Sequence, residues 1–265
     1  MFEALANWRR GRILRRSSLD ERQWRAMLDR YPFTRALSAE ESVRLRERVV
    51  LFLHEKSIVG AGGLTVRDEM RTCIAAQACM LIINLDLDYY RGWVEVIVYP
   101  DEFVAEYDYV DGDGVAHHVA EPMTGESWLE GPVILSWADA QLRGGDSGYN
   151  VVIHEFAHKI DMLNGDANGF PPLHPGMDRG AWSRAFGTAY EDFRGRVERR
   201  EPTMIDPYAA EHPAEFFAVL SEAFIETPAT VFSEYGDVYR QLAAFYRQDP
   251  AARLVRQPLA AGGVR

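Results

Sequence analysis

The sequence predicts an α+β fold, with a small mixed sheet packed on one apolar helix and a mostly helical C-terminal lobe. Three observations support this prediction: segments with helical periodicity occur in both halves of the chain, two short β-branched segments lie between them, and no repeat or low-complexity linker separates them. The 265 residues are 47% hydrophobic and 26% charged, a composition that allows a sizeable core. We therefore expect a single domain, 1–265, with a lobe on each side of a cleft.

The beginning of the chain, residues 1–40, is expected to be an arm of unknown role. Five arginines crowd the first sixteen residues: Arg9, Arg10, Arg12, Arg15 and Arg16. A charge cluster near a terminus is typical of a solvated, mobile segment, and a contact with a partner or a membrane is the less favoured interpretation.

An N-terminal lobe, residues 41–165, is expected to follow the arm. Its first helix is predicted from Glu40 to Lys56, because Ser38 and Glu41 match a capping box ahead of an apolar stripe. A second helix, apolar enough to be buried, is predicted from Val66 to Asn84.

Two strands and a further helix complete this lobe. The β-branched and aromatic segments Trp93–Tyr99 and Pro132–Trp137 are predicted to form the small sheet. The pattern then changes to that of a helix, with Asn150 as its N-cap and Asn164-Gly165 as its stop signal.

The C-terminal lobe, residues 166–257, is predicted to be helical. After a turn-rich stretch, helices are expected near Ala181–Arg200, Pro213–Glu226 and Val238–Gln248. The final residues, 258–265, are expected to form a frayed tail.

Charge and composition exclude several classes of protein. The 29 basic and 40 acidic side chains give a formal net charge of -11, which argues against nucleic-acid binding. No signal peptide is recognisable, and the longest apolar run, Cys73–Leu85, is too short to span a bilayer. The two cysteines, Cys73 and Cys79, cannot make a disulfide framework. We expect a cytoplasmic protein that binds neither nucleic acid nor a membrane.

The segment His154-Glu155-Phe156-Ala157-His158 matches the pattern H-E-x-x-H. One helical turn separates the histidines, so both imidazoles lie on one face, within reach of a single ion. Glu155 then lies beside the metal, where it can take a proton from a zinc-bound water whose pKa is lowered to about 7. The alternative, two hydrogen-bonded core histidines, is disfavoured because unpaired polar groups are costly in so apolar a helix. We therefore predict one zinc ion per chain.

A catalytic zinc usually has three protein ligands, so a third ligand must lie elsewhere. A third histidine six residues after His158 is absent, because Asn164 occupies that position. Glu215, on the apolar helix predicted downstream, is the favoured candidate, since a carboxylate on such a face needs a cation or a histidine as partner. The alternative for Glu215 is to complement the dipole of its helix from the first turn.

Three further residues are candidates for supporting roles. Glu222 lies seven residues after Glu215 and shares its helix face, so it also needs a histidine or a cation. Asp161, three residues after His158, is either the third ligand or, as we favour, a partner that holds a histidine ring nitrogen. Tyr208 lies seven residues before Glu215, where its phenol can donate to a developing oxyanion.

Longer segments carry a resemblance to a known family. VVIHEFAHKID, NGD and IDPYAAEHPAEFFAVLSEAF, together with GPVILSW and WVEVIVYP, resemble the Mlc titration factor A family of zinc-dependent peptidases. The resemblance covers roughly residues 50–250 and leaves out the N-terminal forty. More remotely, the arrangement is similar to the catalytic domain of anthrax lethal factor and to other gluzincins, whose third zinc ligand is a glutamate downstream of H-E-x-x-H.

The resemblance assigns roles to five residues. It implies that His154, His158 and Glu215 are the zinc ligands, that Glu155 is the general base and that Tyr208 is a hydrogen-bond donor in the transition state. The fold that it implies is zincin-like, with the helix of the third ligand across the cleft from the H-E-x-x-H helix.

The function that follows is hydrolysis of peptide bonds by a zinc-bound water that Glu155 activates. By resemblance the activity is aminopeptidase-like, the substrate is a peptide, and a link to the regulation of glucose uptake runs through the transcriptional repressor Mlc. In related enzymes an extended peptide pairs with an edge strand, which we expect to be Pro132–Trp137. The alternative is a non-catalytic zinc-containing protein that sequesters a transcriptional regulator. It is disfavoured because a structural zinc site fills all four positions with protein ligands and does not need Glu155.

Overall fold

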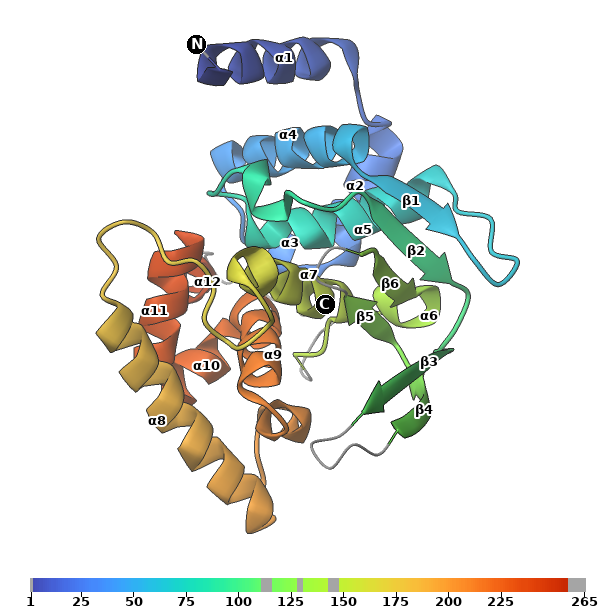
Figure 1. Ribbon diagram of the computed structural model, residues 1–265. Coiled ribbons are helices and arrows are strands. Elements are labelled where there is room, and N and C mark those ends of the chain that lie inside the picture. Colours follow the sequence, from blue (N-terminus) through green and yellow to red (C-terminus); the bar gives the residue numbers. More distant parts are fainter. Residues whose placement is uncertain (1, 111–115, 128–130, 143–147, 257–265) are drawn as a thin grey trace, which may run out of the picture.

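The computed structural model describes residues 2–110, 116–127, 131–142 and 148–256. Helices and a small mixed sheet make up this part of the chain, which confirms the α+β prediction (Figure 1). Within these ranges no helix is both long and apolar enough to cross a membrane. The expected frayed tail, 258–265, lies outside the described residues.

The N-terminal segment is helical. Three helices precede the first predicted one: α1 (Phe2–Arg16), α2 (Glu21–Arg30) and α3 (Pro32–Arg35). Arg10 of α1 forms an ion pair with Asp86, with 2.7 Å between nitrogen and oxygen. Trp24, Met27 and Tyr31 are buried in the core. Helices α2 and α3 are therefore part of the packed molecule, and Ile13 of α1, within the arginine-rich stretch, is buried as well.

The next two helices agree with the sequence-based predictions: α4 (Ala39–Glu55) and α5 (Asp68–Leu81). α4 begins after Ser38, because Ser38 and Glu41 make both hydrogen bonds of the capping box. α5 is buried along most of its length and carries Cys73 and Cys79, both as free thiols.

A four-stranded sheet has the order β1-β2-β6-β5. Its strands are β1 (Ser57–Gly60), β2 (Glu95–Tyr99), β5 (Gly125–Ser127) and β6 (Val133–Ser136). β1, β2 and β6 run parallel, and β5 pairs antiparallel with β6. The prediction that Pro132–Trp137 is an edge strand is wrong, because β6 is paired on both sides and β5 forms the edge. A polar three-residue strand gives no alternating pattern from which it could be predicted.

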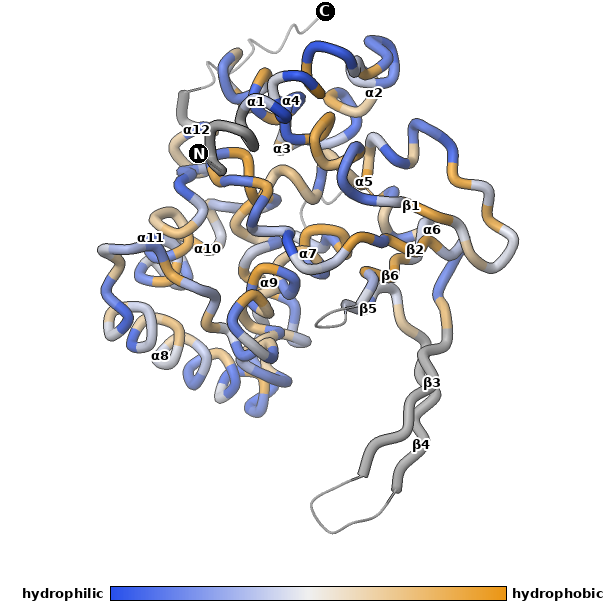
Figure 2. Tube along the Cα trace, turned by 45° about the horizontal axis from the view of Figure 1, so that its top comes forward, coloured by the Kyte–Doolittle hydropathy of each residue, from blue (hydrophilic) through white to orange (hydrophobic). Residues whose placement is uncertain are grey.

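A hairpin lies between β2 and β5 in the order of the chain. Figure 2 shows that β2 and β6, the two central strands of the sheet, are largely hydrophobic. The hairpin consists of β3 (Phe103–Val110) and β4 (Ala116–Met123), paired antiparallel. The register starts with Phe103 opposite Met123. The chain passes from β4 almost directly into β5, so the base of the hairpin lies at the edge of the sheet.

The H-E-x-x-H segment lies on α7 (Val151–Asp161), which contacts β5 and β6 as well as α9. Asn150 is the N-cap, as predicted, because its Oδ1 accepts a hydrogen bond from the backbone N–H of Ile153 at 3.0 Å. After α7 the short 3-10 helix η3 (Met162–Asn164) leads to Gly165, whose φ of 138° ends the helical path.

The C-terminal part is helical, as predicted. Its elements are α8 (Arg179–Glu198), η4 (Pro207–Ala210), α9 (Pro213–Glu226), α10 (Pro228–Glu234), α11 (Gly236–Tyr246) and α12 (Pro250–Arg256). Two short elements of the first half are η1 (Leu87–Tyr90) and α6 (Trp137–Ala140). The ring of Trp182 on α8 packs against Phe217 of α9 and Phe245 of α11, with ring centroids 6.1 and 5.7 Å away. These contacts join α8, α9 and α11.

Candidate metal centre

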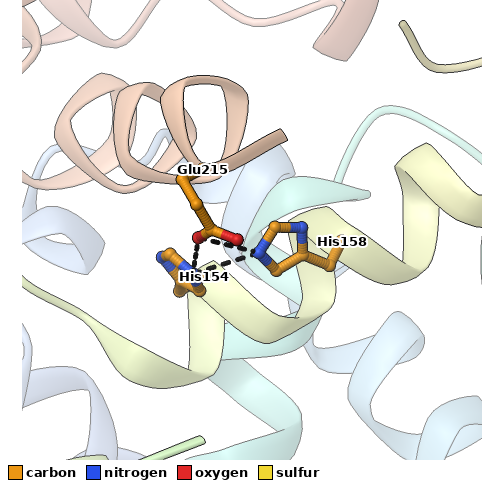
Figure 3. Close-up of side chains that lie close together, drawn as sticks. All are labelled: His154, His158 and Glu215. Carbon is orange, nitrogen blue, oxygen red and sulfur yellow. Dashed lines mark hydrogen bonds and ion pairs between the residues drawn. The ribbon is translucent and has the colours of Figure 1, made fainter. Parts of the chain in front are cut away.

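His154 and His158 project from one face of α7 toward α9 (Figure 3). Their Nε2 atoms are 3.1 Å apart, and only 12% and 9% of the two side chains is exposed. This common orientation follows from their spacing, since residues four apart on a helix share a face.

Glu215 reaches the two histidines from α9. Its Oε2 lies 3.1 Å from Nε2 of His154 and 3.3 Å from Nε2 of His158. Pro213 stands in the first turn of α9 and His212 caps the helix, so Glu215 projects from the first turn. Burial raises the pKa of Glu215, but the two imidazoles outweigh burial and hold the pKa well below its usual range. The structure thus brings together the three residues predicted as metal ligands.

The three atoms are spaced as the ligands of a zinc ion would be. Zinc bonds of about 2.0–2.2 Å in a tetrahedral site separate ligand atoms by about 3.4 Å. The observed separations of 3.1, 3.1 and 3.3 Å are a few tenths of an ångström shorter. Among the described residues, the group of possible ligands consists of His154, His158 and Glu215 alone. Two imidazoles and one carboxylate fit a catalytic zinc site with an open position.

Glu222 holds the ring of His154 from the side opposite Glu215. Its Oε1 lies 2.7 Å from Nδ1 of His154, and its Oε2 accepts a hydrogen bond from the backbone N–H of Asn150. A carboxylate at Nδ1 favours the tautomer with the proton on Nδ1, which leaves the Nε2 lone pair for a metal. Burial lowers the pKa of His154, but Glu222 and Glu215 outweigh burial and raise it well above its usual value. A cation at Nε2 would displace the second proton.

Asp161 does not contact a histidine ring by a hydrogen bond. Its Oδ2 accepts hydrogen bonds from the backbone N–H groups of Asn168 and Gly169, at 2.7 and 2.6 Å. Its Oδ1 and Nδ1 of His158 are both buried and make no hydrogen bond within the described part of the chain. Asp161 therefore anchors the segment after α7, while Glu222 makes the contact that we expected of Asp161.

Glu155 faces a cavity of about 310 Å³ beside the three candidate ligands. The residue is 5% exposed, and burial raises the pKa of its carboxyl group. β5 passes very close to it: a Cβ atom at Gly125 would lie 2.6 Å from Oε1 of Glu155 and 2.7 Å from Cγ2 of Val151. The edge strand can approach α7 at this point because residue 125 has no side chain.

Tyr208 lies on η4 and lines the same cavity. Tyr208 is 46% exposed to solvent, and the centroid of its ring is 6.1 Å from that of the His154 ring. The ring therefore lies near the candidate metal ligands, at the partly exposed side of the cavity.

Several cavity residues were not predicted from the sequence. Those with polar side chains are Thr124, Tyr149 and Asp206. The Tyr149 hydroxyl donates to Oγ1 of Thr124 at 3.0 Å, and Asp206 caps η4 by accepting from the backbone N–H of Tyr208 at 2.9 Å. Tyr149 and Asp206 lie within two residues of Asn150 and Tyr208, which was the available signal, whereas Thr124 is not adjacent to any predicted site or cap residue.

Comparisons with known proteins agree with this geometry. The profile of the family described as glucose-regulated metallo-peptidase M90 matches residues 5–247. The chain is 37% identical to Mlc titration factor A of Serratia proteamaculans (strain 568) over 237 residues, which cover 88% of this chain and 90% of that protein. It is 36% identical to Mlc titration factor A of Yersinia enterocolitica over 237 residues, 88% of each chain.

A further relative is an uncharacterised protein of Synechocystis sp., 37% identical over 232 residues, 86% of this chain and 84% of that protein. The family match begins at residue 5 and so includes α2 and α3. The expectation that the similarity leaves out the first forty residues is therefore wrong.

Proposed function

This chain belongs to the glucose-regulated metallo-peptidase family M90, and on that premise we propose that it is a zinc-dependent peptidase of the gluzincin type. One observation carries the proposal: His154, His158 and Glu215 converge on one point from two helices. This point lies beside a cavity that His154 and Glu155 line. We propose that these three residues hold one zinc ion per chain.

When bound there, zinc supplies a Lewis acid that lowers the pKa of a water molecule to about 7. Glu155 then accepts the proton of the attacking water and delivers it to the leaving amine. The burial of Glu155 supports this role, because a carboxyl group with a raised pKa can carry the proton between the two steps. The phenol of Tyr208 donates a hydrogen bond to the oxyanion that forms on the scissile carbonyl.

We propose that the substrate is a peptide bound in extended form along β5. Within the described residues β5 pairs with β6 alone, so its other edge is available for an added strand. Gly125 of this strand is in contact range of Glu155. A peptide paired with β5 would therefore present its backbone beside the general base.

An aminopeptidase-like specificity is supported by the charges of the cavity. Its described lining contains the carboxylates of Glu155, Asp206 and Glu222, and neither lysine nor arginine. Glu222 is hydrogen-bonded to His154, and Glu155 serves as the base. Asp206, which caps η4 through Oδ1, is then the carboxylate that can contact the substrate. A carboxylate in this position can pair with the free α-amino group of a peptide.

The partner and the cellular role rest on the relatives. Two of them are named for titration of Mlc, and we propose that a transcriptional repressor of the Mlc type is a partner of this chain in the cytoplasm. A purely non-catalytic binding role is the alternative. The buried Glu155 beside the three candidate ligands argues against it, because a binding protein has no use for a proton acceptor there.

We also propose that residues 41–165 and 166–257 are the two lobes of one catalytic domain. The candidate ligands support this division, since His154 and His158 come from the first segment and Glu215 from the second.

A peptidase assay on zinc-loaded protein tests the proposal. Short peptides with a free N-terminus should be cleaved, and their N-acetylated counterparts should be cleaved more slowly. Metal analysis of the same protein should give about one zinc per chain. Equal cleavage of both peptide sets would contradict only the aminopeptidase-like specificity and would leave the peptidase proposal in place. If zinc-loaded protein cleaves no peptide, the enzymatic proposal has to be withdrawn.

A further inference from the structure

A line of buried polar side chains connects the metal centre with the N-terminal helices. It leads from His154 through Glu222 and Asn150 to Gln77 of α5 and to Tyr31, which follows α2. Beyond His154, the exposed fractions along the line are 3%, 4%, 1% and 0%. Buried polar groups are costly unless each is paired, so a continuous line through a core has to be accounted for.

Each link in this line has a defined donor and acceptor. Nε2 of Gln77 donates to the hydroxyl of Tyr31 and to the carbonyl of Ala140, both at 3.0 Å. Oε1 of Gln77 therefore points the other way, and it accepts from Nδ2 of Asn150 at 2.9 Å. Nδ2 of Asn150 also donates to Oε1 of Glu226 at 2.8 Å, so Gln77 and Glu226 together orient this amide. Oδ1 of Asn150 caps α7, and the backbone N–H of Asn150 donates to Glu222.

The last link reaches the metal centre. One oxygen of Glu222 is held by Asn150, so the other is presented to Nδ1 of His154 at 2.7 Å. A proton on Nδ1 leaves the Nε2 lone pair directed at the point where Glu215 and His158 converge. Because the link from Asn150 to Glu222 is made by the backbone N–H of Asn150, Gln77 acts on Glu222 through the position of Asn150 at the start of α7.

We propose that Gln77 and Tyr31 are positioning residues for the metal centre: through Asn150 and Glu222 they hold His154 in the tautomer and orientation that ligate a metal. This inference rests on the proposed function, because it requires zinc at Nε2 of His154. It gives the N-terminal helices a role in the site. The competing explanation is a polar cluster that contributes to stability alone, with no effect on the metal.

A double-mutant cycle on zinc affinity separates the two explanations. Zinc dissociation constants are measured by competition with a chromophoric chelator for the wild type, Gln77→Leu, Glu222→Gln and the double variant. Glu222→Gln should weaken zinc binding about 10- to 100-fold. Gln77→Leu should weaken it about threefold or more, and this effect should largely disappear in the Glu222→Gln background, because members of one hydrogen-bond network are coupled.

Gln248→Leu is a matched control for a lost buried amide. Gln248 is 4% exposed, and its Nε2 donates to the carbonyls of Met80 and Leu81 at 2.8 and 3.0 Å, outside the line described above. This variant should lose stability and keep the zinc affinity of the wild type. If Gln77→Leu does not fold, Tyr31→Phe removes a single hydroxyl and should still weaken zinc binding.

Three outcomes would overturn the inference. The first is an unchanged zinc affinity in Gln77→Leu, or in Tyr31→Phe where that variant replaces it. The second is that the effects of Gln77→Leu and Glu222→Gln multiply, as those of independent changes do. The third is that Gln248→Leu weakens zinc binding as much as Gln77→Leu does. In each case a wild type that binds zinc and cleaves peptides would leave the proposed function intact. A wild type that binds no zinc would overturn both.

Discussion

The carboxylate of Asp161, at the end of α7, holds the backbone of Gly169, with 2.6 Å between Oδ2 and the amide nitrogen. Gly169 has a φ of 77°, and a Cβ atom there would lie 2.5 Å from the carbonyl oxygen of Pro213. Pro213 stands in the first turn of α9, two residues before Glu215. Asp161 is thereby linked, through this close contact, to the start of the helix that carries the third candidate ligand.

We predict that Asp161→Ala lowers both stability and zinc affinity. The backbone N–H groups of Asn168 and Gly169 lose their acceptor, which costs about 1–3 kcal/mol in the free energy of unfolding for the buried group on Gly169, and the support of α9 loosens. Asp161→Asn keeps an acceptor oxygen for these N–H groups and should therefore weaken zinc binding less than Asp161→Ala does. Urea unfolding and zinc titration measure the two effects. Lost stability with full zinc affinity would show that Asp161 anchors the loop and nothing more.

Gly125→Ala should reduce peptidase activity about tenfold or more while zinc stays bound, because the new methyl group meets Glu155 and Val151 at 2.6 and 2.7 Å. Steady-state kinetics with a parallel metal analysis checks this. Gly187→Ala is the matched control, since a Cβ atom on that exposed position of α8 meets nothing within 4 Å. Normal activity in Gly125→Ala would mean that β5 and Glu155 can move apart without consequence.

A pH-dependent stability is expected from Lys56, one of only two lysines in the sequence. Its Nζ is 4.0 Å from the ring centroid of Trp93 and donates to the carbonyl of Trp93 at 2.6 Å. Burial lowers the pKa of Lys56 to about 8. Between about pH 8 and pH 10 the unfolded chain, with a lysine pKa of about 10.4, binds a proton that the folded protein lacks.

The free energy of unfolding should therefore receive a contribution from Lys56 that rises with pH in this window. Lys56→Met removes the titrating group, so the free energy of unfolding of this variant should rise less steeply with pH than that of the wild type. Urea denaturation at several pH values compares the two slopes. Identical slopes would show that Lys56 keeps an ordinary pKa in the folded protein.

Tyr208→Phe should slow chemistry and leave binding nearly unchanged. A phenol that donates to the oxyanion interacts more strongly with the transition state than with the bound peptide. Loss of one such donor costs about 2.7–4 kcal/mol, so kcat should fall on the order of 100-fold or more, with KM and zinc content little changed. An unchanged kcat would assign Tyr208 to packing at the rim of the cavity, where its 46% exposure already places it.

The helices with strong capping signals could be predicted almost to the residue. α4 begins after the Ser38 capping box, α7 after Asn150 and α9 at Pro213. Caps and first-turn prolines act through local hydrogen bonds, so they can be recognised without the tertiary structure. β5 was missed because the pairing of three polar residues is determined by the neighbouring strand and not by their own pattern.

The candidate ligands could also be predicted, but which residue contacts which ligand could not. Spacing shows that Asp161 and Glu222 each lie on a ligand-bearing helix face. It does not show how α7 crosses α9, and the crossing decides that Glu222 meets His154 while Asp161 meets the loop at Gly169. Gln77 was missed for the same reason, because its partners are far away in the sequence.

The peptidase activity of Glu155→Gln, measured on protein of known zinc content, tests the central claim most directly. Glutamine keeps the shape of the side chain but cannot accept the proton of the attacking water. Our account predicts a folded protein with about one zinc per chain and nearly complete loss of hydrolysis. Peptide cleavage at the wild-type rate by zinc-loaded Glu155→Gln would contradict it.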